Sequence, residues 1–197
     1  MKNLVYILCV CIVLFSAFVL ASCRRSVARV NVGEQIDLSG RWNDVDSRQV
    51  SAEMTSDVLA RPWLGSFLDK EKRKPVVIVG TILNKSHEHI ETEAFIKDME
   101  RSFINAGTVR VVQNSVLREK MREERADQQD FSSPESQKKW GKELGADFML
   151  LGTIASVVDQ FRRKKVVFYK VNLELAHLET NEKVWIGDKE IKKFIKN

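Results

Sequence analysis

The sequence predicts an α/β domain in which helices flank a mixed β-sheet. Two short apolar runs, residues 76–82 and 147–154, have the composition of buried strands, and helical patterns lie between them. Apolar and polar side chains alternate over residues 167–175, as in a strand with one exposed face, and residues 184–191 return as its partner. Helices interleaved with early strands, followed by an antiparallel meander, predict the mixed sheet.

The first elements follow from apolar spacing and from proline. Residues 27–32 read as a weak strand. A helix is expected over residues 46–59, and Asp46 or Ser47 can cap it. Pro62 breaks this helical pattern, because proline disfavours helical backbone at the residue before it.

The middle of the chain has clearer signals. The apolar side chains of residues 92–106 form one helical stripe, and Gly107 can take the left-handed backbone that ends a helix. Residues 109–112 read as the next strand. Asn114 can cap a highly charged helix over residues 115–129.

A further helix is predicted to begin at Ser133-Pro134, because serine is a favoured cap and proline suits the first helical position. Trp140 and Leu144 would face the core, and Gly145 would end this helix before the strand at 147–154.

The N-terminus predicts an exported lipoprotein. Lys2 precedes an apolar run, residues 4–21, and the run closes in Leu20-Ala21-Ser22-Cys23, which is the layout of a secretory signal with a lipobox. We expect cleavage before Cys23 and acylation of its thiol. A transmembrane helix is the alternative, although a simple anchor has no need of Ala-Ser-Cys at that border.

The predicted organisation is a signal peptide at residues 1–22, a short tether at 23–37 and one domain at 38–197. Fully extended, residues 24–37 reach at most about 50 Å. The mature chain would carry 31 Lys and Arg against 27 Asp and Glu, a net charge of +4 that permits contact with anionic lipid without requiring it. No disulfide is expected, since two of the three cysteines leave with the signal and Cys23 carries lipid.

Metal-ligating residues are sparse. One candidate set combines two histidines with neighbouring carboxylates: His87, His89, Glu88 and Glu91. Nothing fixes their geometry, so a loop role is favoured. Asp44 and Asp46 resemble two carboxylates of a calcium loop, but the glycine and distal glutamate of that motif are absent, which favours a turn and a helix cap.

Catalytic motifs are also absent from the sequence. It has no Gly-x-Ser-x-Gly elbow, and the mature chain has no free thiol. The basic run Arg162-Arg163-Lys164-Lys165 reads as a solvated hairpin tip, with contact to anionic lipid as the alternative, and export argues against nucleic acid. We therefore expect a non-catalytic binding protein without a cofactor or a metal.

Trp42, Arg61 and Trp63 are the candidate partner-binding residues. Both tryptophans lie next to arginines outside the periodic helices, and Trp and Arg are favoured interface anchors. Covering the sheet edge is the alternative role of the two tryptophans.

Several segments, taken in order, resemble the penicillin-binding protein activator LpoB family over nearly all of residues 39–193. They are Ser39-Gly40-Arg41-Trp42-Asn43-Asp44, Asp46-Ser47-Arg48, Arg61-Pro62-Trp63, Lys74-Pro75-Val76-Val77, Asn84-Lys85-Ser86-His87-Glu88-His89-Ile90, Leu144-Gly145-Ala146-Asp147, Gly152, Leu178-Glu179-Thr180 and Lys183-Val184-Trp185. The resemblance implies a fold like the TolB N-terminal domain.

The resemblance also implies a role. It points to a monomeric lipoprotein on the periplasmic face of the outer membrane that binds and stimulates a class A penicillin-binding protein, a bifunctional peptidoglycan synthase. The long Pro-rich linker of the best-known members is nearly missing here. The alternative is a CsgG-like secretion or envelope-assembly lipoprotein, which would need additional amphipathic segments.

Overall fold

The structure is a computed structural model that describes residues 28–31, 33–131 and 143–196. The chain divides into two units at Gln35/Ile36. In the first unit, the described residues form no helix or strand, so the weak strand expected over residues 27–32 is not seen in its described part. Cys23 and the other signal-peptide residues lie outside the described residues.

The second unit is a mixed α/β domain, as predicted. Its elements in chain order are α2 (Asp44–Leu59), α3 (Pro62–Glu71), β1 (Val76–Lys85), α4 (Thr92–Ala106), β2 (Arg110–Val112), α5 (Ser115–Phe131), β3 (Phe148–Phe161), β4 (Lys164–His177) and β5 (Lys183–Lys196). The sheet order is β2-β1-β3-β4-β5. β1 runs parallel to β2 and β3, whereas β3, β4 and β5 form the predicted antiparallel meander.

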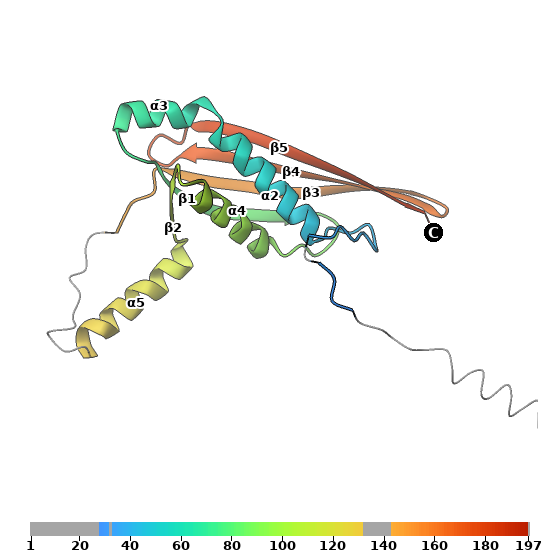
Figure 1. The fold of residues 1–197 in the computed structure, drawn as a ribbon, viewed down its shortest axis with the longest axis horizontal. Coiled ribbons are helices and arrows are strands. Elements are labelled where there is room, and N and C mark those ends of the chain that lie inside the picture. The colour runs from blue at the N-terminus through green and yellow to red at the C-terminus, as the bar shows by residue number, and fades with distance from the viewer. Residues whose placement is uncertain (1–27, 32, 132–142, 197) are drawn as a thin grey trace, which may run out of the picture. The chain divides into compact units, whose positions relative to one another are not determined.

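The hydrophobic core lies between one face of the sheet and a helical layer in which α2 and α4 cross the strands (Figure 1). Its principal members are Val50, Met54 and Val58 of α2, Phe95, Met99 and Phe103 of α4, and Val77, Val79, Leu150, Tyr169, Val171 and Leu173 of the sheet. In β4, every second residue from Val167 to Leu175 is buried, and the residues between them are partly exposed on the opposite face. In β3 only Phe148, Leu150 and Ile154 are buried and the residues between them are partly exposed, so it is not the strand buried on both faces that its composition predicts.

Two helix starts differ from the prediction. α2 begins two residues early because Asn43 is its N-cap: the Asn43 side chain accepts from the Asp46 backbone, and the Asp46 carboxylate accepts from the Asn43 backbone. α3 is an additional helix that the sequence pattern does not predict, because Pro62 there indicates only the end of a helical pattern. Proline is well suited to the first helical position, where its missing N–H is not needed, so it ends one pattern and begins the next helix.

The helix predicted to begin at Ser133 falls largely on residues 132–142, which lie outside the described residues. Residues 143–146 are described and form no regular element. Leu144 is 45% exposed, so its predicted place in the core is wrong. The helical spacing that would turn it inward does not apply to this irregular stretch.

Gly107 ends α4 in the left-handed conformation, as predicted, with φ 68°.

The three meander strands are longer than their sequence patterns indicate, with 14 residues each. β3 and β4 pair as far as Phe161 and Lys164, which leaves a two-residue turn, Arg162-Arg163. The basic run is therefore a hairpin tip, as predicted.

Asp147 fastens the start of β3 to the start of β1. Its carboxylate accepts two hydrogen bonds from the Arg73 guanidinium and one from the backbone N–H of Val76, each 2.7 Å long. Burial favours a higher pKa, but the bonds from Arg73 and Val76 outweigh it and hold the pKa of Asp147 below its ordinary value. The charged carboxylate thus clamps the first residues of two parallel strands.

Candidate functional site

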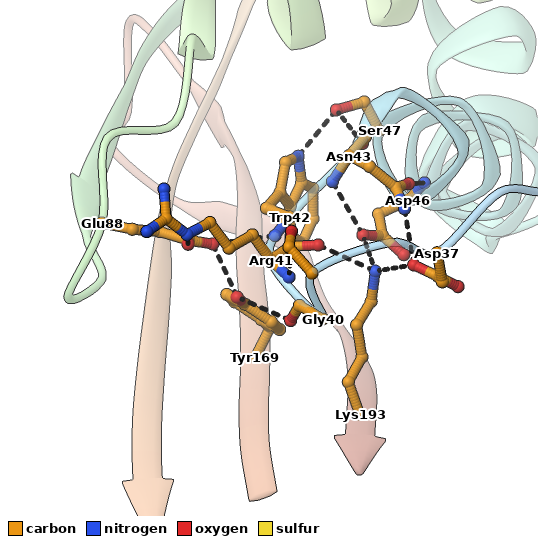
Figure 2. A network of polar contacts seen from close by, with 11 residues as sticks. Asp37, Gly40, Arg41, Trp42, Asn43, Asp46, Ser47, Glu88, Tyr169 and Lys193 are labelled. Atoms are coloured by element: carbon orange, nitrogen blue, oxygen red, sulfur yellow. Dashed lines mark hydrogen bonds and ion pairs between the residues drawn. The ribbon is translucent and has the colours of Figure 1, made fainter. Parts of the chain in front are cut away.

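Two sequence motifs that lie far apart in the chain meet in one network of polar contacts (Figure 2). Residues 37–43, named here the clasp segment, contact the loop after β1 and the strands β4 and β5. The backbone N–H of Trp42 donates to Glu88 Oε1 at 2.8 Å, and the Tyr169 hydroxyl donates to the same oxygen at 2.6 Å. Glu88 therefore joins the clasp segment to β4, the strand that carries Tyr169.

Trp42 is half-buried in this junction. Its indole Nε1 donates to Ser47 Oγ at 2.7 Å, and its ring meets the edge of Tyr169 at a centroid distance of 5.6 Å. The neighbouring Arg41 side chain is 77% exposed, with its Nε 3.9 Å from Glu88 Oε2. The clasp segment thus turns an indole inward and a guanidinium outward.

Tyr169 is fully buried beneath the clasp segment. Burial raises the pKa of its hydroxyl, and the hydrogen bond to the Glu88 carboxylate and the charge of that carboxylate raise it further. The phenol therefore remains neutral at physiological pH and serves as a hydrogen-bond donor.

Lys193 of β5 holds the other side of the clasp segment. Its ammonium donates to Asp46 Oδ2 at 2.6 Å, to Asp37 Oδ1 at 2.7 Å and to the Arg41 carbonyl at 3.0 Å. Burial lowers the pKa of Lys193, but the bonds to Asp37 and Asp46 more than offset this, so the pKa lies above its ordinary value. The side chain is only 9% exposed and uses all three of its donors.

The two histidines of the loop after β1 play different parts. The Nδ1 atom of His87 lies 2.7 Å from Ser156 Oγ, and its backbone N–H donates to the same hydroxyl at 2.9 Å, which pins the loop to β3. His89 is exposed, with its Nε2 4.0 Å from Glu91. Among the residues that the structure describes, no group of three His, Cys, Asp or Glu side chains could hold a metal ion.

The three candidate partner-binding residues do not form one patch. Trp63 is 7% exposed, donates from Nε1 to the Val58 carbonyl at 2.7 Å and packs on Phe148, so its side chain belongs to the core. Arg61 is 53% exposed and pairs with Asp57. Trp42 and Arg61 flank α2, whose 16 residues span about 24 Å.

Sequence reasoning missed Trp185, which links β5 to the helical layer. Its indole Nε1 donates to Asp57 Oδ2 at 2.8 Å, and its ring is buried. Its partner lies 128 positions away in the chain, and no local pattern indicates such a contact.

The described part of the chain holds no helix with the length and apolarity that a membrane crossing requires. A family model described as "Peptidoglycan-synthase activator LpoB" matches residues 46–191. A comparison with curated proteins gave no match.

Solved structures give weak similarities at low identity. The LpoB C-terminal domain from Escherichia coli is 17% identical, covers 75% of this chain and 99% of its own, and has a TM-score of 0.47. The lipoprotein GNA1162 from Neisseria meningitidis is 14% identical, with 61% and 83% coverage and a TM-score of 0.41. The LpoB C-terminal domain from Salmonella enterica is 14% identical, with 67% and 94% coverage and a TM-score of 0.36.

Proposed function

Because the chain belongs to the peptidoglycan-synthase activator LpoB family, we propose that it binds and stimulates a bifunctional class A penicillin-binding protein. The family match carries this proposal, since it extends from the first turn of α2 into β5 and includes most of the domain. We propose that the domain acts as a monomer.

Stimulation requires that the domain bind the active state of the synthase more tightly than the resting state, because a ligand shifts an equilibrium only through differential affinity. Trp42, Arg61 and Trp63 remain our candidate binding residues. Since Trp42 and Arg61 flank α2, a surface that uses both would extend along that helix. Trp63 would act indirectly, by fixing the start of α3 that follows Arg61.

The activator proposal predicts a loss of stimulation in an Arg61→Ala variant. We expect its affinity for the cognate synthase to fall about tenfold or more, the effect typical of a central interface arginine. Glycan polymerisation would be followed while residues 26–197 are titrated into the purified synthase. Arg101→Ala is the matched control, because Arg101 is also an exposed arginine with a local partner, Asp98.

An unchanged polymerisation rate at saturating unmodified domain, together with no detectable binding, would remove the activator function itself. Full stimulation by the Arg61→Ala variant would instead reject only the role of Arg61 as a binding residue.

The anchoring proposal rests on the lipobox. We propose that residues 1–22 are removed, that Cys23 carries the lipid, and that residues 23–37 tether the domain to the periplasmic face of the outer membrane. Cys23→Ala should then move the protein from the detergent phase to the aqueous phase or leave its precursor uncleaved. Unaltered partitioning with an unaltered mass would contradict lipidation at this residue.

A further inference from the structure

One end of the meander carries exposed apolar side chains that the core does not use. These residues, 157–168 and 192–196, are named here the ribbon tip. Val157, Phe161 and Phe194 are 65%, 71% and 62% exposed. Because Lys193 and Ile195 face the clasp segment, Phe194 between them points to the opposite face of the sheet.

The strand register brings these side chains together on that opposite face. Phe194 pairs with Val166, and Val157 pairs with Phe168 on the neighbouring strands. Phe161 ends β3 at the turn, where the Arg162 guanidinium lies 5.2 Å from the centroid of its ring. The apolar residues therefore form a small group at the end of a narrow ribbon.

Basic residues surround this group. Residues 159–166 and 192–196 contain seven Lys and Arg but one acidic residue, Asp159. Of the seven, Lys193 is held by Asp37 and Asp46. The other six form no ion pair with any residue that the structure describes: Arg162, Arg163, Lys164, Lys165, Lys192 and Lys196. Their charge is available to an anionic partner.

The chain enters the domain beside the ribbon tip. Asp37 is bonded to Lys193, and Gly40 packs against Ile195. Lys193 is three residues from the end of β5, which corresponds to about 10 Å. If the proposed lipid is attached at Cys23, the short tether holds this end of the domain towards the bilayer.

We propose that the ribbon tip docks onto an anionic lipid surface. Phe161 and Phe194 lie at headgroup depth, where aromatic rings are favoured, and the six basic residues named above lie against lipid phosphates. A large protein partner is less well matched, because a standard interface buries about 800 Å² on each side, whereas this apolar group is small and lies at a narrow end. Docking would therefore orient the domain, with the ribbon tip at the membrane and α3 directed away from it.

Vesicle binding tests this assignment without the lipid anchor. Residues 26–197 retain the whole core, whose members lie between Val50 and Trp185, so this soluble form should fold. We expect it to co-sediment with phosphatidylglycerol vesicles, not with phosphatidylcholine vesicles, and to be released by salt. The double variant Phe161→Ser/Arg163→Glu should bind at least about tenfold more weakly, since each basic residue near the surface contributes severalfold.

The matched control is Ile186→Ser/Lys120→Glu. It makes the same change in charge and removes an equally exposed apolar side chain, because Ile186 is 71% exposed at the other end of β5. We expect this control to bind within about twofold of the unmodified domain. Equal losses in both double variants, or no binding of the unmodified domain to phosphatidylglycerol, would overturn the proposal.

A second measurement reports insertion directly. Residues 26–197 contain no cysteine, so Phe161→Cys and Ile186→Cys each provide one labelling site. An environment-sensitive dye at position 161 should shift to the blue with phosphatidylglycerol vesicles, and the dye at 186 should not. If the shift at 161 instead follows protein concentration without vesicles, the tip contacts a second copy of the chain and the lipid assignment is wrong. Because neither experiment contains a synthase, failure here is separate from failure of the activator function.

Discussion

Lys193→Met should lower the free energy of unfolding by about 3–4 kcal/mol, because removing one partner of a buried ion pair leaves the other charge uncompensated. Asp46 is 5% exposed and would lose the ammonium that now lies 2.6 Å from its carboxylate. The same change removes the Lys193 hydrogen bonds to Asp37 and to the Arg41 carbonyl. We therefore also expect faster tryptic cleavage after Arg41, because the clasp segment loses its attachment to β5.

Urea unfolding followed by tryptophan fluorescence would measure the effect, with Lys189→Met as the control. Lys189 lies on the same strand and face and pairs with Glu53, but this pair is more exposed, so its loss should cost less than about 1 kcal/mol. The double variant Lys193→Met/Asp46→Asn should recover part of the loss, because it removes the stranded charge. Equal effects of the two lysine substitutions would contradict the special role of Lys193.

The pH dependence of this pair has a defined sign. The pKa of Lys193 is raised in the folded state, so its contribution is fully present below the unfolded lysine value of about 10.4 and is lost as the pH rises through the higher folded pKa. The stability difference between the unmodified domain and Lys193→Met should therefore stay constant from about pH 7 to 10 and shrink only above that range.

Gly152→Ala should destabilise the domain by about 2–3 kcal/mol through steric conflict in the sheet. A Cβ at this position would lie 2.3 Å from Leu173 Cδ2 and 2.5 Å from the backbone oxygen of Asn172. Leu173 can change rotamer, but the Asn172 carbonyl belongs to the β3–β4 ladder and cannot move without separating the strands. Thermal unfolding would show this as a lower midpoint.

Gly65→Ala provides a control of opposite sign. Gly65 lies inside α3, and a Cβ there would meet no atom within 4 Å. Alanine in a helix restricts the unfolded chain without strain, so this variant should be about 0.5–1 kcal/mol more stable. A Gly152→Ala domain as stable as the unmodified one would show that the strands separate at little cost.

The fold was predictable where its signals are local. The apolar stripe of α4 and its glycine stop lie within 16 consecutive residues. The stop and most of the stripe are seen as expected, but Ile104, predicted in the stripe, is 60% exposed. Pro62 is also a local signal, but an ambiguous one, because a proline can end one helix or begin the next. The outer ends of the meander strands were missed because the last residues of β3 are exposed without alternation, and the inward-facing positions near the end of β5 include the charged Lys193.

The contacts of the clasp segment could not be predicted, because they join residues that lie far apart in the sequence. Tyr169 and Glu88 are 81 positions apart, and Lys193 and Asp37 are 156 apart. A sequence pattern shows that Tyr169 faces inward but not which carboxylate its hydroxyl meets. Trp63 illustrates the converse: its neighbours suggest an interface anchor, and only the packing against Phe148 shows that the ring is enclosed.

β5 is the last strand in the sheet order, so one of its long sides offers backbone donors and acceptors to any other extended chain. Molecules tethered to one membrane share a thin layer and meet far more often than in free solution. Five of the 14 residues of β5 are lysines, and two such strands side by side would bring like charges into register. If the chain is anchored through Cys23 as proposed, these lysines disfavour edge-to-edge pairing and aggregation of molecules crowded on the membrane.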